Sequence, residues 1–176
     1  RRSIAESLTH YCPRPLLVIQ DRCEPWKTMR IMSSPHETQT DLIRSCVKWG
    51  QSVNIEPTVR VLHTDCEQPA TDAKTASDGL KATQDLTKAL PELKGKKVDV
   101  RTTSDLNEYW KSDAEENEHI LLVIPVTEVN GVRLTPFGTT PDVMVRYLNH
   151  PAILFWMESS ATDQVPEAQK SVSGAV

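Results

Sequence analysis

The sequence has 176 residues, enough for about one domain with a substantial core. Its 20 basic and 24 acidic residues give a net charge of -4, whereas nucleic-acid-binding proteins usually carry an excess of positive charge. The apolar stretches are far shorter than the roughly 20 residues of a membrane-spanning helix, and the first residues lack the apolar segment of a signal peptide. We therefore expect a soluble, cytoplasmic chain that neither binds nucleic acid nor inserts into a membrane.

The four cysteines are Cys12, Cys23, Cys46 and Cys66, and none are paired at the short spacings of metal-binding motifs. The sequence also contains no Asn-x-Ser/Thr glycosylation site. These two features favour a reducing, cytosolic setting with free thiols and no bound metal.

Six short apolar runs, rich in β-branched residues and bounded by turn residues, predict strands. In chain order they span 16–19, 29–32, 59–63, 97–101, 119–124 and 152–156. The runs at 120–124 and 152–156 are apolar almost throughout, which is typical of strands covered on both faces of a parallel sheet.

Helical patterns lie between these strands. Apolar residues at spacings of three and four predict helices over 37–53, 76–93, 105–113 and 140–148. We interpret 67–75 as a loop and 158–176 as a disordered tail, because neither has an apolar period. The alternation predicts an α/β domain over 28–157, with a five-stranded parallel open sheet and helices on both faces.

Two segments of the chain resemble each other. Residues 11–19 match residues 147–155 without a gap, at a separation of 136 residues. Each copy consists of the end of a helix, a tyrosine, a turn with proline and a buried strand. Either the similarity arose by chance, or residues 1–22 are the last helix and strand of an earlier repeat.

Five strands alternating with four helices, ending in a hydroxyl-led helix, a proline turn and an apolar strand, resemble a universal stress protein domain. The resemblance covers 28–157, and a tandem arrangement would account for 1–20. In that family a phosphate-cradling motif follows the fourth strand: Gly, two residues, Gly, nine residues, then Gly-Ser/Thr. Here Gly138 and Thr139 match the final pair, whereas Pro125 and Glu128 occupy the earlier glycine positions. Proline lacks an N–H donor and glutamate is negatively charged, so the resemblance implies a degenerate nucleotide site.

The resemblance also implies a cleft beyond the carboxyl ends of the central strands. Ser33 and Ser34 would form one lip, at the position where the family has an acidic residue. The other residues of the degenerate cleft follow the fourth strand: Thr127, Gly131, Gly138, Thr139 and Thr140. We expect no bound cofactor, and weak binding of ATP or AMP is the alternative.

No set of residues indicates catalysis. The segment from Ser34 to Glu37 combines a hydroxyl, an imidazole and a carboxylate, but the chain has no G-x-S-x-G nucleophile motif and the segment is typical of a helix start. We expect a non-enzymatic regulatory and dimerisation domain. Similar domains form cytosolic C-terminal regions of membrane transporters, including cation–chloride cotransporters and cation–proton antiporters, so the resemblance implies such a parent protein. The alternative is an adenine-nucleotide-binding sensor of the stress response.

The strands at 16–20 and 152–157 are the expected assembly elements. As terminal strands of their sheets they would present unpaired backbone groups, either for self-association or for packing on the preceding repeat. The membrane part of a parent transporter is a further candidate partner. The predicted interface residues are Leu17, Ile19, Leu154, Phe155 and Trp156.

Overall fold

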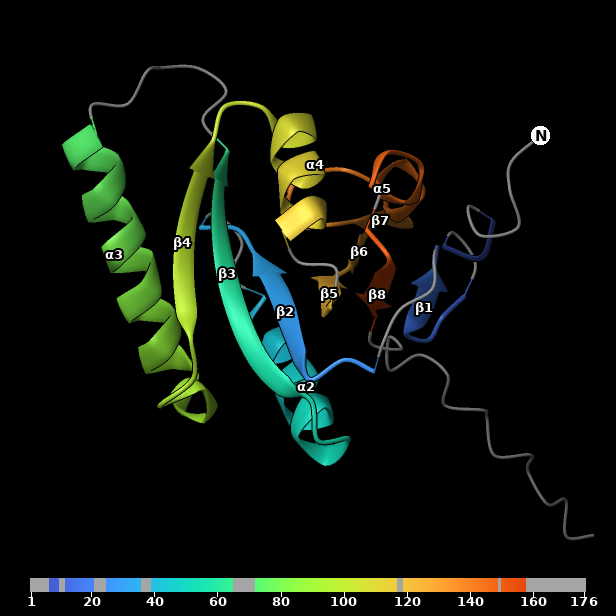
Figure 1. Ribbon diagram of the computed structural model, residues 1–176, viewed down its shortest axis with the longest axis horizontal. Helices are drawn as coiled ribbons and strands as arrows, with labels where there is room; N and C mark the ends of the chain where they lie inside the picture. Colours follow the sequence, from blue (N-terminus) through green and yellow to red (C-terminus); the bar gives the residue numbers. More distant parts are fainter. Residues whose placement is uncertain are drawn as a thin grey trace, which may run out of the picture.

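The computed structural model describes residues 7–9, 12–20, 25–35, 39–64, 72–116, 119–148 and 150–157. Six of its strands form one twisted sheet with helices on both faces (Figure 1). Their order across the sheet is β1-β8-β5-β2-β3-β4. Their bounds are Leu16–Ile19 (β1), Thr28–Ser33 (β2), Glu56–Thr64 (β3), Val98–Thr103 (β4), Ile120–Pro125 (β5) and Ala152–Trp156 (β8).

The prediction of five parallel strands over 28–157 is confirmed, since β2, β3, β4, β5 and β8 pair in parallel. The sixth strand, β1, pairs antiparallel with β8, with Leu17 opposite Leu154. The prediction that β8 is a terminal strand was therefore wrong, because β8 has β5 on one side and β1 on the other. Its apolar sequence fits this interior position, where both faces are covered.

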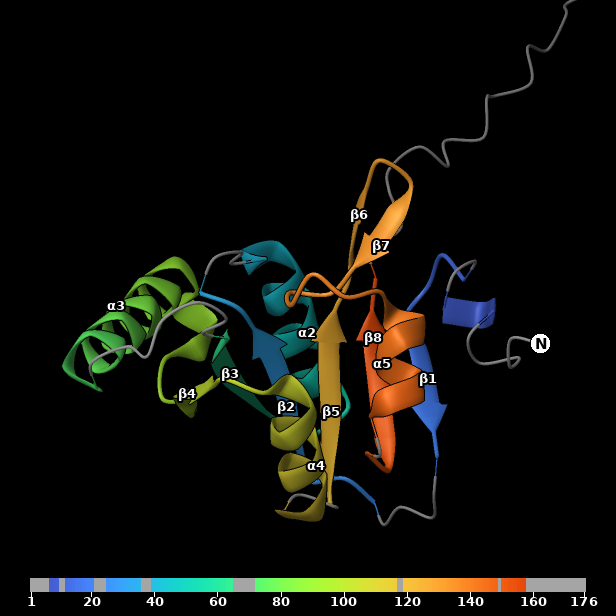
Figure 2. The ribbon, with the colours of Figure 1, turned by 90° about the horizontal axis from the view of Figure 1, so that it is seen from above.

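Helices cover the sheet on both faces. Figure 2 shows α4 (Leu106–Glu116) and α5 (Pro141–Tyr147) on one side and α2 (Thr40–Ser52) on the other. The helix α3 (Asp72–Ala89) follows β3 and is succeeded by the short 3₁₀ turn η1 (Pro91–Leu93). The predicted loop at 67–75 is wrong in its last residues, because α3 already begins at Asp72. The predicted tail at 158–176 lies outside the described residues.

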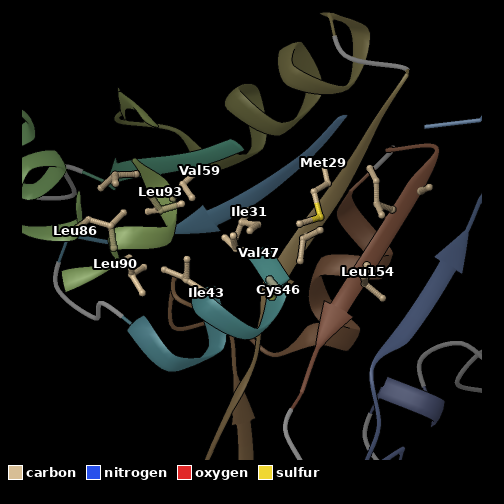
Figure 3. Packing of buried hydrophobic residues seen from close by; sticks show 14 residues of the cluster. Met29, Ile31, Ile43, Cys46, Val47, Val59, Leu86, Leu90, Leu93 and Leu154 are labelled. Carbon is tan, nitrogen blue, oxygen red and sulfur yellow. The ribbon is translucent and has the colours of Figure 1, made fainter. Parts of the chain in front are cut away.

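Two hydrophobic clusters fill the two layers between sheet and helices. Figure 3 shows the cluster under α2 and η1, in which Ile43 and Val47 of α2 pack against Met29 and Ile31 of β2. Leu122 and Ile124 of β5 point to the other side, into the cluster under α4 and α5. This alternation along β5 is the period of two that a strand imposes on its side chains.

A two-stranded hairpin, absent from the predicted elements, follows β5. It consists of β6 (Thr127–Val129) and β7 (Val132–Leu134), joined by Asn130 and Gly131 with φ of 52° and 76°. Positive φ at both central residues is the signature of a type I′ turn, and Asn-Gly is its preferred sequence. The segment expected to cradle phosphates is thus folded on itself.

Candidate functional site

The expected cleft begins where β2 and β5 end, at neighbouring strands of the sheet. Ser33 and Ser34, its predicted lip, are only 1% and 7% exposed. Both residues are therefore buried at the end of β2, and the hydroxyl of Ser33 donates to the carbonyl oxygen of Ser34 at 3.5 Å. Their role in binding a ligand stays a prediction.

The β6–β7 hairpin makes contacts within the protein at the place expected for phosphates. The hydroxyl of Thr127 accepts a hydrogen bond from Gln39 Nε2 at 3.3 Å. Arg133 Nη1 donates to the carbonyl oxygens of Thr9 at 3.0 Å and Cys12 at 2.7 Å, and its Nε lies 3.7 Å from Glu128. The hairpin therefore ties the segment before β1 to the end of β5.

Gly138, Thr139 and Thr140 form a closed turn before α5. The Thr135 and Thr139 hydroxyl oxygens are 2.9 Å apart, and the Thr135 N–H donates to the Thr139 carbonyl at 2.8 Å. The Gly138 N–H donates to Thr135, and Gly138 has φ of 73°, which glycine adopts without strain. Several of the donors and acceptors in this turn are therefore already used within it.

Beside this turn lies a small apolar cavity of about 80 Å³ between α4 and α5. Trp110 and Phe137 line it with their ring centroids 5.6 Å apart in an edge-to-face arrangement. Its lining offers few polar groups, so it suits an apolar group and gives no support to a phosphate at this end of the sheet.

The two predicted interface strands differ in exposure. Leu17 and Ile19 of β1 are 42% and 56% exposed, as a docking surface requires. Leu154 and Phe155 of β8 are 5% and 0% exposed, so the prediction that they form a surface was wrong. They are covered because β8 lies inside the sheet, with Leu154 in the cluster under α2 and Phe155 in the cluster under α5.

Trp156 lies on the same face of the sheet as the exposed side chains of β1. Leu17 shares a sheet face with Leu154 because the two residues are paired, and Trp156 follows two positions later on that same face. Trp156, the fifth predicted interface residue, is half-buried and packs 5.6 Å from Trp49 of α2 between ring centroids. The result is an apolar face made of Leu17, Ile19, Trp49 and Trp156, which we call the β1 face.

Sequence reasoning missed a buried charged cluster between the sheet and α4. Asp113 of α4 accepts hydrogen bonds from Arg30 of β2 and Arg60 of β3, and the three side chains are buried. Tyr109 joins it through a 3.0 Å hydrogen bond from Arg60. Charged residues inside apolar strands at 30 and 60 are the signal that would have revealed it, because a buried charge requires a partner.

Burial dominates the electrostatics of this cluster. Desolvation, together with the nearby Arg60 charge, lowers the pKa of Arg30, although Asp113 opposes the shift. Desolvation acts on Arg60 in the same direction, but hydrogen bonds to Asp99 and Tyr109 leave its pKa raised. Desolvation raises the pKa of Tyr109, so the phenol is neutral at neutral pH. A guanidinium group is not deprotonated in proteins, so both arginines keep their charge.

We also searched the described residues for a metal site, a membrane-spanning helix and a disulfide. No group of three or more His, Cys, Asp or Glu side chains in this part of the chain is placed to hold a metal ion. None of the described helices combines the length and the apolar character needed to span a bilayer. The described cysteines, Cys12 and Cys46, are free thiols.

Comparison with known proteins returns solved structures of low sequence identity and no sequence relatives. No family model and no curated protein matches the sequence. A protein of the universal stress protein family from Burkholderia pseudomallei is similar in structure at a TM-score of 0.47 and 13% identity, covering 74% of this chain and 96% of that one. A universal stress protein in complex with cAMP matches at a TM-score of 0.45 and 12% identity, and the match covers 78% of this chain and 100% of that one. The α/β architecture with its mostly parallel six-stranded sheet rests on the structure itself.

Proposed function

We propose that the chain is a non-enzymatic regulatory domain that acts by assembly, and that two copies meet through β1. The observation that carries this proposal is the exposure of Leu17 and Ile19, at 42% and 56%, on a strand at the edge of the sheet. Figures 1 and 2 both place β1 beyond β8, at the opposite end of the sheet from β4.

The outer edge of β1 carries none of three features that commonly block strand pairing. Edge strands of soluble proteins are commonly blunted by lysine, proline or a bulge. β1 is Leu16-Leu17-Val18-Ile19, with no charge, no proline and no bulge in its regular pairing with β8. Such a strand suits pairing with another strand, because the N–H and C=O groups on the outer side of an edge strand can form a ladder.

A second copy of the same chain is the partner that fits this edge. Antiparallel pairing of β1 with β1 of another copy produces a two-fold interface in which the same residues meet from both sides. Leu17 and Ile19 of the two copies would then pack together, beside the Trp49–Trp156 pair. Large aromatic groups next to an apolar centre are typical anchors of protein interfaces.

We base the proposed parent protein, a membrane transporter, on the sequence resemblance. Cytosolic C-terminal regions of membrane transporters contain domains that resemble this one, and a regulatory assembly domain suits that position. The transporter context therefore rests on the resemblance, whereas assembly through β1 rests on the exposed edge. The experiment below tests assembly through β1.

Sedimentation velocity of the purified chain tests the assembly surface. The wild type is expected to shift from monomer to dimer as its concentration rises, and Ile19→Glu is expected to stay monomeric because a charge cannot be buried at the centre of the contact. Leu80→Glu is the matched control, because Leu80 is 62% exposed on α3, outside the β1 face. A wild type that remains monomeric, or an Ile19→Glu variant that dimerises equally well, would refute the proposal.

A further inference from the structure

A polar cavity of about 220 Å³ lies between the strands β3 and β4 and the helix α4. A cavity needs only roughly 10–15 Å³ to hold one water, so this one has space for a larger polar group. None of its lining residues belongs to the loops after β2 or β5, so it is separate from the expected nucleotide cleft. The lining residues are Arg60, Arg101, Thr102, Tyr109, Ser112 and Asp113.

Two carboxylates at or beside this cavity, those of Asp113 and Asp99, are paired with buried arginines. Asp113 Oδ1 lies 2.7 Å from Nη1 of Arg30 and 2.7 Å from Nη1 of Arg60. Asp99 Oδ2 accepts a hydrogen bond from Nε of Arg60 at 3.0 Å and forms an ion pair with Nη2 of the same side chain at 2.8 Å. Each carboxylate therefore makes its charge-assisted contacts to guanidinium groups through one oxygen, Oδ1 of Asp113 and Oδ2 of Asp99.

Arg101 brings an additional positive charge to the same place. It follows Asp99 by two residues on β4, so it faces α4 as Asp99 does. Its Nε lies 3.7 Å from Asp99 Oδ2, beyond hydrogen-bond distance, and its side chain is 62% exposed. Counting Arg30, Arg60 and Arg101 against Asp99 and Asp113 leaves one positive charge in excess.

The wall opposite Arg101 offers a hydroxyl. Ser112 is exposed on α4, one residue before Asp113, and lines the cavity. A serine hydroxyl can donate to an anion, and a guanidinium presents a planar fork that fits the oxygens of a phosphate. Excess positive charge, a guanidinium with spare donors and a hydroxyl across a polar cavity together define the chemistry of an oxyanion site.

We propose that this cavity binds a phosphate group, held by Arg101 and Ser112 above the buried Arg60. Inorganic phosphate and a small phosphomonoester share the chemistry that the site recognises. The proposal is independent of assembly through β1, because none of the residues that it uses lies on the β1 face.

An NMR titration of the ¹⁵N-labelled chain at constant ionic strength tests the site, with inorganic phosphate, methyl phosphate and acetate as probes. Phosphate is expected to give saturable shifts of the amide signals of Arg101 and Ser112. Methyl phosphate binding equally well would identify esters as ligands, and weaker binding would identify the free ion. Acetate binding as tightly as phosphate, or shifts that spread over surface lysines without saturation, would overturn the proposal.

Two variants with the same change of charge separate the site from general attraction. Arg101→Gln is expected to weaken phosphate binding roughly tenfold, the value of one charge-assisted hydrogen bond. Lys111→Gln is the control, because Lys111 is exposed on α4 but does not line the cavity. Both variants should keep the wild-type spectrum elsewhere, since both side chains are exposed. Equal affinities in the two variants would refute the assignment.

Discussion

Arg60 and Asp113 form a buried ion pair that joins β3 to α4. Nη1 of Arg60 lies 2.7 Å from Oδ1 of Asp113, and the two residues are 6% and 3% exposed. Arg30, on the neighbouring strand β2, reaches the same oxygen at 2.7 Å. Three elements distant in sequence thus meet at one carboxylate oxygen, and α4 is held to the sheet by charge as well as by apolar contact.

Replacing Asp113 by alanine is expected to lower the free energy of unfolding by about 3–5 kcal/mol, because two buried guanidinium groups lose their partner. The exposed Asp41 gives the contrast: its carboxylate is 84% exposed and pairs with Arg44 three residues later. Asp41→Ala should cost only about 0.3–0.5 kcal/mol. Urea unfolding measures both losses, and similar values for the two variants would contradict the importance of the buried cluster.

His150 is expected to make stability depend on pH. Desolvation and the charge of Arg30 lower its pKa, while Asp113 and the hydrogen bond to Ala152 oppose the shift. The folded state therefore binds fewer protons than the unfolded state, so the stability from neutral His150 is complete above the unfolded pKa of about 6.5 and is lost as pH falls below it. Urea unfolding of wild type and His150→Gln between about pH 8 and pH 5 checks this. A stability difference that does not shrink toward acid pH would contradict the prediction.

Gly50 is required where α2 meets the sheet. A Cβ at this position would overlap Cε of Met29 and would lie 2.9 Å from its Sδ and 3.1 Å from the carbonyl oxygen of Ile55. Met29 is fully buried, so it has little room to move. Gly50→Ala is expected to cost about 1–3 kcal/mol, the usual range for overpacking a core. In a double-mutant cycle with Met29→Val the loss should be smaller; an unchanged loss would exclude Met29 as the cause.

Adenine nucleotides are not expected to stabilise the chain. Ser33 and Ser34 are buried, and Arg133 of the hairpin is occupied by the carbonyl groups of Thr9 and Cys12. A ligand that binds only the folded state adds about 2.7 kcal/mol at 100 times its dissociation constant, which thermal unfolding detects readily. A saturable shift with ATP and Mg²⁺ or with AMP would contradict this prediction and favour a nucleotide sensor.

The parallel part of the fold could be predicted because its signals are local. Continuous apolar runs such as 120–124 require cover on both faces, and the helices between them follow from apolar spacing. The partner of β1 could not be predicted in this way, because four apolar residues are compatible with either edge of a sheet. The hairpin was predictable: Asn130-Gly131 between Val129 and Val132 is a strong turn signal.

The internal similarity illustrates what spacing alone leaves open. A two-fold axis that exchanges adjacent antiparallel strands runs perpendicular to the sheet, so it keeps equivalent residues on the same face. The gapless match makes Leu17 equivalent to Ile153, but Leu17 pairs with Leu154 and therefore shares its face, opposite to that of Ile153. The 136-residue separation is thus incompatible with such an axis between β1 and β8. An internal repeat remains a prediction, and it would require the alignment of the two segments to be shifted by one residue.

The charged cluster and the polar cavity depend on tertiary contacts. Arg60 and Asp113 are 53 residues apart, and nothing in the local sequence pairs them. An arginine within a strand that is otherwise buried indicates that a partner exists, but only the packing of α4 identifies it. The same holds for the β1 face, since Trp49 and Trp156 meet only after α2 and β8 are packed together.

Amide hydrogen exchange in β1, measured at several protein concentrations, tests the central claim most directly. Alternate N–H groups of an antiparallel edge strand point away from its neighbour, so those of Leu16–Ile19 that face away from β8 exchange rapidly in a monomer. Assembly through β1 predicts that these outward amides become protected as dimer forms, and that they stay unprotected in Ile19→Glu. Outward amides that exchange rapidly at every concentration would contradict the account, whatever dimer is present.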